Sequence, residues 1–121
     1  MKIAIGYKIH KYSWGGGNQF VTSIAQYAKS KGHEIVYELK DKNIDIILII
    51  DPRSYEQGVP FSLFDVFKYL LFTNKNAIVV HRINECDERK NTKYINMMLK
   101  RTNFLADHTV FIASWLRNLN I

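Results

Sequence analysis

The stretch Asp45-Ile46-Ile47-Leu48-Ile49-Ile50-Asp51 decides the fold of this chain. Five consecutive isoleucine and leucine residues between two aspartates are typical of a strand that is buried on both faces of a parallel sheet. The run is far too short for a membrane-spanning helix, which needs roughly 20 apolar residues. The rest of the sequence must therefore supply helices that cover both faces of such a sheet.

Segments of strand and helix character alternate on either side of this run. Apolar or alternating patterns predict further strands at 2–6, 34–39, 77–81 and 109–113. Apolar residues at helical spacing predict helices from Asn18 to the stop signal Gly32, over 61–72, from Asn91 or Thr92 to Leu105, and after Ser114. This alternation predicts an α/β fold, a Rossmann-like parallel sheet of about five strands with helices on both faces.

Two of these helices carry specific expectations about which side chains share a face. In the helix over 61–72, Phe64, Phe67, Leu70 and Leu71 lie on one side. In the last helix, the large apolar residues are expected to face inward, namely Trp115, Leu116 and Leu119.

Composition predicts one soluble domain that spans residues 1–121. Cys86 is the only cysteine, so we expect a reducing compartment, the cytoplasm. The formal net charge is +6, but lysine and arginine are scattered without a dense basic run, which argues against nucleic acid as a partner. A basic surface would also suit peripheral contact with a membrane.

The segment Gly15-Gly16-Gly17-Asn18 follows the first strand and opens a helix. Glycines let the backbone approach a ligand closely, and a helix N-terminus offers unpaired N–H groups and partial positive charge. Together these features predict a phosphate site. The alternative is a turn that merely needs glycine conformations. Eight residues separate Gly6 from Gly15, so the pattern is not a dinucleotide fingerprint.

A second polar segment follows the fourth predicted strand, where ligands of parallel sheets bind. His81 could hydrogen-bond a sugar hydroxyl, and Arg82 could hold a phosphate group. No recognised metal-ligand spacing is present, so we expect no metal. Asp51, after the third strand, could bind a ribose, a metal or a phosphoryl group, or could simply open a turn.

These segments, with the closing run Ala106-Asp107-His108-Thr109-Val110-Phe111-Ile112-Ala113-Ser114-Trp115-Leu116-Arg117, resemble the N-terminal domain of family-4-type glycosyltransferases with the GT-B fold. The resemblance covers nearly the whole chain. In the closing run, Trp115 follows the serine one residue earlier than is usual in the family. The resemblance implies retaining transfer of a sugar from a UDP- or GDP-sugar to a glycan or lipid-linked acceptor, without a further cofactor.

The same resemblance implies roles for individual residues. Gly15, Gly16 and Gly17 would approach the donor diphosphate; Asn18 and Arg82, from their own chemistry and position, are expected to bind beside them. His81, or Asn84 in the loop that follows, would lie near the transferred sugar. The nucleotide pocket would belong to a C-terminal domain that this chain lacks, so we expect the chain alone to be inactive.

Two other functions remain open at this stage. A receiver-type signalling domain has a similar length and strand number, with Asp51 in the position of a phosphoacceptor. Such domains need two acids after the first strand, where this chain has Tyr7-Lys8. The other alternative, a non-catalytic nucleotide- or sugar-binding module, would use the same glycine loop.

Overall fold

The computed structural model describes residues 1–8, 16–50, 60–83, 95–112 and 115. Its strands are β1 (Lys2–Ile5), β2 (Glu34–Val36), β3 (Ile46–Ile49), β4 (Ile78–Ile83) and β5 (His108–Phe111). Its helices are α1 (Gly16–Ser30), α2 (Leu63–Phe72) and α4 (Ile95–Leu105). Strands and helices therefore alternate along the described part of the chain, except that β3 follows β2 with no helix between them.

All five strands belong to one parallel sheet with the order β2-β1-β3-β4-β5. The chain moves from β1 outward to β2, and then from β3 in the opposite direction to β4 and β5. This reversal makes the space between β1 and β3 a topological switch point, where open α/β sheets bind their ligands. The order is the one found in flavodoxin-like sheets.

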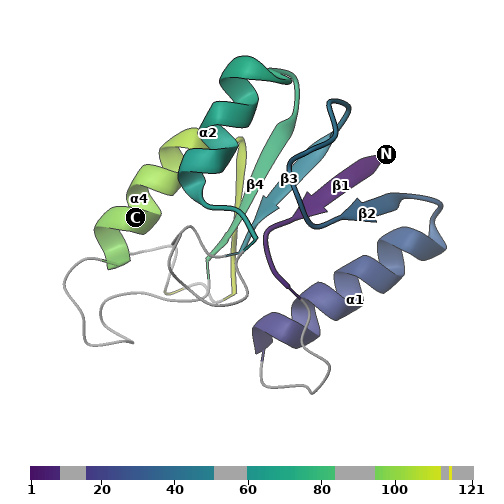
Figure 1. Cartoon of the computed structure of the whole chain (residues 1–121). Helices are drawn as coiled ribbons and strands as arrows, with labels where there is room; N and C mark the ends of the chain where they lie inside the picture. Colours follow the sequence, from purple (N-terminus) through teal and green to yellow (C-terminus); the bar gives the residue numbers. More distant parts are fainter. Residues whose placement is uncertain (9–15, 51–59, 84–94, 113–114, 116–121) are drawn as a thin grey trace.

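Helices cover both faces of the sheet, which confirms the predicted α/β class (Figure 1). On one face, Val21 and Ala25 of α1 pack with Ile5 and Leu48 of the sheet. On the other face lie α2 and α4, and this core includes Ala4, Ile47, Val79 and the α2 residues Val66 and Tyr69. Because side chains alternate along a strand, β1, β2, β3 and β4 each contribute to both cores. The near-continuous apolar sequence of β3 follows from this double burial.

Residues 37–45 connect β2 to β3 without a helix and pass over the α2 face, where Leu39 and Ile44 join the core. Tyr69 of α2 holds this crossover. Its hydroxyl donates a 2.6 Å hydrogen bond to the carbonyl of Asp41 and accepts one of 3.2 Å from the amide of Ile44. Asn74 adds a 3.0 Å bond from its side-chain amide to the carbonyl of Ile44. One buried phenol thus satisfies polar backbone groups that a crossover helix would satisfy internally.

Some predicted boundaries are wrong, for local reasons. α1 begins at Gly16, so Asn18 lies in its first turn and is not the N-cap. β2 ends at Val36, three residues before the predicted end, because the crossover leaves the sheet there. β4 extends two residues beyond His81, and β5 covers His108–Phe111 instead of 109–113. Gly32 does end α1, with a positive φ of 85° that favours glycine.

The helix over 61–72 forms, but its apolar side does not face the core as a whole. Ser62 caps α2 through a reciprocal capping box with Asp65, and Val66 and Tyr69 are the buried residues of the helix. Of the four residues expected on one side, Leu70 is half-buried, whereas Phe64, Phe67 and Leu71 are exposed. Trp115 is also exposed, against expectation, while Leu116 and Leu119 lie outside the described residues.

Within the described ranges, no helix is both long and apolar enough to cross a bilayer.

Candidate functional site

The carboxyl ends of β1 and β3 are packed closely together at the switch point. The amide of Gly6, directly after β1, donates a 2.9 Å hydrogen bond to the carbonyl of Leu48. A Cβ atom at Gly6 would lie 2.9 Å from Cε2 of Phe61 and 3.3 Å from the Leu48 carbonyl oxygen. Gly6 is therefore required because Phe61, just before α2, packs directly against the end of β1. This contact brings the chain after β1 and the start of α2 to the same edge of the sheet.

Arg82 lies at this carboxyl edge, near the end of β4, and its side chain is directed to the α1 face. Its guanidinium carbon lies 4.3 Å from the centre of the Phe20 ring, and only 5% of the residue is exposed. Phe20 belongs to the second turn of α1, four residues after Gly16. The contact therefore holds a buried cation beside the first turns of the helix that begins with the glycines.

The first turn of α1 contains Gly16, Gly17 and Asn18, of which Asn18 is 6% exposed. A helix start of this kind presents backbone N–H groups and partial positive charge. Arg82 adds a full positive charge on the same face of the sheet. A guanidinium stacked on a ring uses its flat face, so the contact with Phe20 does not consume its N–H donors. Together these groups can recognise an anion such as a phosphate.

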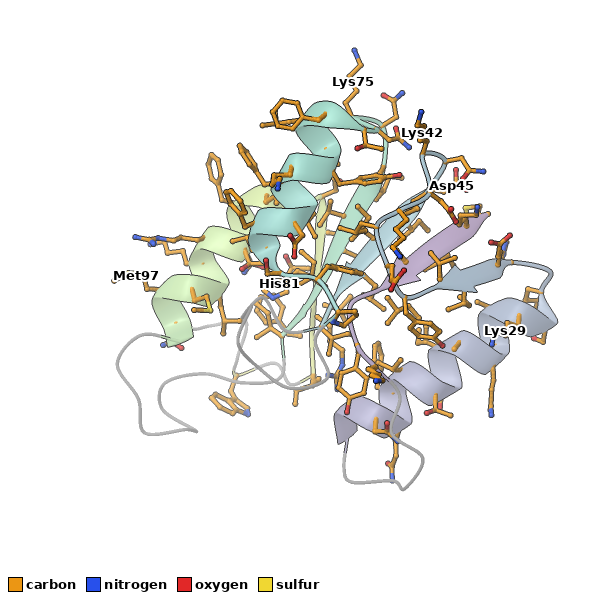
Figure 2. The ribbon with its side chains drawn as sticks, in the orientation of Figure 1. Lys29, Lys42, Asp45, Lys75, His81 and Met97 are labelled. Carbon is orange, nitrogen blue, oxygen red and sulfur yellow. The ribbon has the colours of Figure 1, made fainter. Side chains whose placement is uncertain are left out.

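His81 precedes Arg82 and is directed to the opposite face, because neighbouring residues of a strand alternate. Its ring is fully buried, and in Figure 2 it lies below the lower end of α2 and beside α4. Nδ1 of His81 lies 2.7 Å from Oδ1 of Asn103 in α4, and the Thr109 hydroxyl donates a 3.0 Å hydrogen bond to the same oxygen. An amide oxygen only accepts, so Nδ1 carries the proton and Nε2 carries the lone pair in the neutral ring.

The side chains of two tyrosines also lie at the carboxyl edge on the α1 face. Tyr7 follows β1 and Tyr37 follows β2, and both pack against the core beneath α1. Burial raises the pKa of the Tyr37 phenol above its usual value. The phenol therefore stays protonated at physiological pH and can donate a hydrogen bond.

The structure brings together only some of the predicted site residues. Gly16, Gly17 and Asn18 lie in the first turn of α1, and Arg82 lies beside that helix. His81 is at the same edge but on the other face. Gly15 and Asn84 lie outside the described residues, as does Asp51.

Sequence reasoning missed Phe20 and Asn103, the residues that hold Arg82 and His81. Phe20 belongs to the apolar pattern that predicts α1, and that pattern does not indicate a cationic partner. Asn103 interrupts the apolar spacing of α4, and a polar residue on a buried helix face is a signal that could have identified it. Its partner became clear only from the sheet register, which pairs His81 of β4 with Thr109 of β5.

Two further features bear on the chemistry of the chain. A shallow cavity of about 220 Å³ lies beside α2, where Leu39, Tyr69 and Phe72 contribute to its lining, and it contains none of the predicted site residues. Among the described residues, no three histidine, cysteine, aspartate or glutamate side chains are grouped as a metal would require.

Comparisons of the chain with protein-family models, with curated protein sequences and with solved structures found no match.

Proposed function

We propose that this domain binds the diphosphate of a nucleotide sugar and forms the N-terminal half of a retaining glycosyltransferase. The observation that carries the proposal is the stacking of buried Arg82 on Phe20, beside the glycine-rich start of α1. A guanidinium can donate two parallel hydrogen bonds to a phosphate group, and a helix N-terminus attracts the same negative charge. A diphosphate at the carboxyl edge could contact both groups.

The chemistry assigned to this half is binding and orientation. Backbone N–H groups of the first turn of α1 would contact one phosphate, and the guanidinium of Arg82 would donate to its oxygens in bidentate geometry. Loss of the diphosphate leaving group requires further positive charge across a closed cleft. We therefore propose that the nucleotide pocket and that charge belong to a second domain, and that the acceptor is a glycan or a lipid-linked glycan.

The role of His81 in this proposal follows from its burial. The ring is fully buried and bonded to Asn103 of α4, a geometry suited to shaping the end of β4. We propose that His81 acts through this support. Asn84, which follows β4, keeps the proposed contact with the transferred sugar.

The strand order gives some support to one other function. The order β2-β1-β3-β4-β5 is shared with receiver domains, whose phosphoacceptor follows the third strand. Asp51 has that place in the sequence. Against this function, Tyr7 and Lys8 follow β1, where a receiver needs acids to hold Mg²⁺.

The two functions are separated by amide NMR spectra of the ¹⁵N-labelled chain. UDP-glucose and GDP-mannose are titrated to millimolar concentration, and beryllium fluoride with Mg²⁺ is added in a separate sample. The proposal expects shifts from the sugar nucleotides that are centred on residues 15–20 and 82–84. Shifts centred on Asp51 that appear only with beryllium fluoride and Mg²⁺ would refute it and favour the receiver function.

A further inference from the structure

The described helices α2 and α4 expose six large apolar side chains. In α2 these are Phe64, Phe67, Leu71 and Phe72, which are exposed by 67%, 46%, 59% and 80%. In α4 they are Met97 and Phe104, exposed by 58% and 95%. Apart from Phe72, the last residue of α2, their spacings of three, four and seven residues place five of them on one stripe of each helix. Each stripe lies opposite the residues that the helix buries against the sheet, such as Val66 and Leu99.

Three cationic side chains are interspersed with these apolar residues, and a fourth lies just beyond the end of α2. The three are Lys68 of α2 and Lys100 and Arg101 of α4, and the fourth is Lys75; all four are exposed. In Figure 2, Met97 projects from α4 at the left of the view, and Lys75 projects from the end of α2 at the top. The only acidic residue of α2 and α4 is Asp65, whose carboxylate is bonded to Ser62 in the α2 cap. We call the five apolar and four basic residues the outer helical face.

A cation and an aromatic ring are in contact within the outer helical face. The Nζ atom of Lys68 lies 5.5 Å from the centre of the Phe64 ring, one helical turn away. A lysine in such a position can cover apolar surface with its aliphatic chain while its ammonium group remains at the aqueous boundary. Aromatic rings beside cations are the pattern of protein surfaces that bind at a lipid headgroup layer.

We propose that the outer helical face docks on an anionic lipid bilayer, with Phe64, Phe67 and Phe104 entering the interface and the cations contacting headgroups. Charge argues against a second copy as the occupant, because two such faces would oppose four cations with four cations. The apolar groups also lie along the outer stripes of two helices, and a lipid surface, unlike a folded partner, needs no matching shape. This inference does not depend on the proposed sugar-nucleotide site, which lies at the sheet edge.

Vesicle flotation of the full chain tests the proposal. We expect binding to vesicles of 70% phosphatidylcholine and 30% phosphatidylglycerol at low salt, and little binding to phosphatidylcholine alone. The double substitution Phe64→Ser and Phe67→Ser should weaken partitioning at least tenfold, because two exposed rings no longer enter the interface. The triple substitution Lys68→Gln, Lys100→Gln and Arg101→Gln should weaken it about fivefold per charge.

The chain offers a matched control on its opposite side. Lys31, directly after α1, lies 5.7 Å from the ring of the exposed Tyr27 of that helix, the same pairing at the same sequence spacing. The variant Tyr27→Ser with Lys31→Gln should retain full partitioning, and so should Arg82→Gln. Absence of binding to the anionic vesicles, or equal loss in the α1 control, would overturn the proposal. So would a lipid-independent dimer that Phe67→Ser dissociates, since the face would then be a contact between copies.

Discussion

The guanidinium carbon of Arg82 lies 4.3 Å from the centre of the Phe20 ring, so that β4 and α1 are joined by a cation–π contact at the carboxyl edge of the sheet. Replacement of Phe20 by leucine keeps an apolar side chain but removes the ring. Because Arg82 is buried, we expect the free energy of unfolding to fall by about 1–2 kcal/mol. Urea denaturation measures this change.

The control for this prediction is Tyr27→Leu, which removes the ring beneath the exposed Lys31. There the loss should stay below about 0.5–1 kcal/mol, because the cation is solvated. If Phe20→Leu and Tyr27→Leu cost the same, the Arg82–Phe20 contact does not have the role assigned to it.

Tyr69→Phe tests the support of the helix-free crossover. The substitution preserves the ring but removes the hydroxyl that bonds to the Asp41 carbonyl and the Ile44 amide. Ile44 is fully buried, so its amide would lose its partner without access to water. We expect a loss of about 1–3 kcal/mol in stability. Tyr27→Phe, at an exposed phenol, should be nearly neutral, and a neutral Tyr69→Phe would contradict the assigned role.

Gly6→Ala tests the close packing at the switch point. The new methyl group would lie 2.9 Å from the Phe61 ring and 3.3 Å from a backbone oxygen, and both neighbours are held in the core. We expect a destabilisation of about 1–3 kcal/mol, measured by thermal or urea unfolding. In the Phe61→Leu background the same substitution should cost clearly less. An equal cost in both backgrounds would mean that the ring is not what excludes the methyl group.

The tautomer of His81 gives a prediction that NMR can read directly. Asn103 Oδ1 accepts from the ring at 2.7 Å and from the Thr109 hydroxyl at 3.0 Å, which requires the proton on Nδ1. We therefore expect the ¹⁵N shift of a protonated Nδ1. Asn103→Leu should abolish this preference and destabilise the fold by about 1–3 kcal/mol. An Nδ1 atom without a proton in the wild-type chain would refute the assignment.

Lys2 predicts a stability change at alkaline pH. A 3.0 Å hydrogen bond to the Asp41 carboxylate raises the pKa of Lys2 above its ordinary value, with further favourable charge from Asp41 and Glu34. A raised folded-state pKa gives stability that is fully present below the ordinary lysine pKa and is lost as the pH rises through the folded-state pKa. The unfolding midpoint of the wild type should therefore exceed that of Lys2→Met at neutral pH, and this difference should shrink at alkaline pH. For the control Lys29→Met, at an exposed lysine, the difference from the wild type should not shrink in this way.

The sequence predicted the class of fold and the presence of the five strands, but not the residues that contact Arg82 and His81. The continuous Ile46–Ile49 run required burial on both faces, so α/β architecture followed from it. The exact ends of β2 and β4 did not follow, because they depend on where the crossover leaves the sheet and on pairing with β5. Periodicity placed Phe64, Phe67 and Leu71 together, yet it could not say whether that side of α2 meets the sheet or the solvent.

The site illustrates the same limit. The residue types at Gly16, Gly17 and Arg82 predicted anion recognition from chemistry alone. That Arg82 is directed to α1 and His81 to α4 follows from the extension of β4 by two residues, a tertiary effect of its pairing with β5. The local sequence does not indicate that pairing, so it could not predict that these two side chains are directed to opposite faces of the sheet.

The most direct test of the central claim is the dissociation constant of UDP-glucose, measured by NMR titration or calorimetry for three proteins. These are the wild type, Arg82→Gln and the control Arg101→Gln, which removes an exposed arginine from α4. If Arg82 and the start of α1 bind the diphosphate, Arg82→Gln should weaken binding about 10- to 100-fold, as expected for a lost charged hydrogen bond. Arg101→Gln should leave the affinity unchanged. Equal affinities for all three folded proteins would contradict the claim.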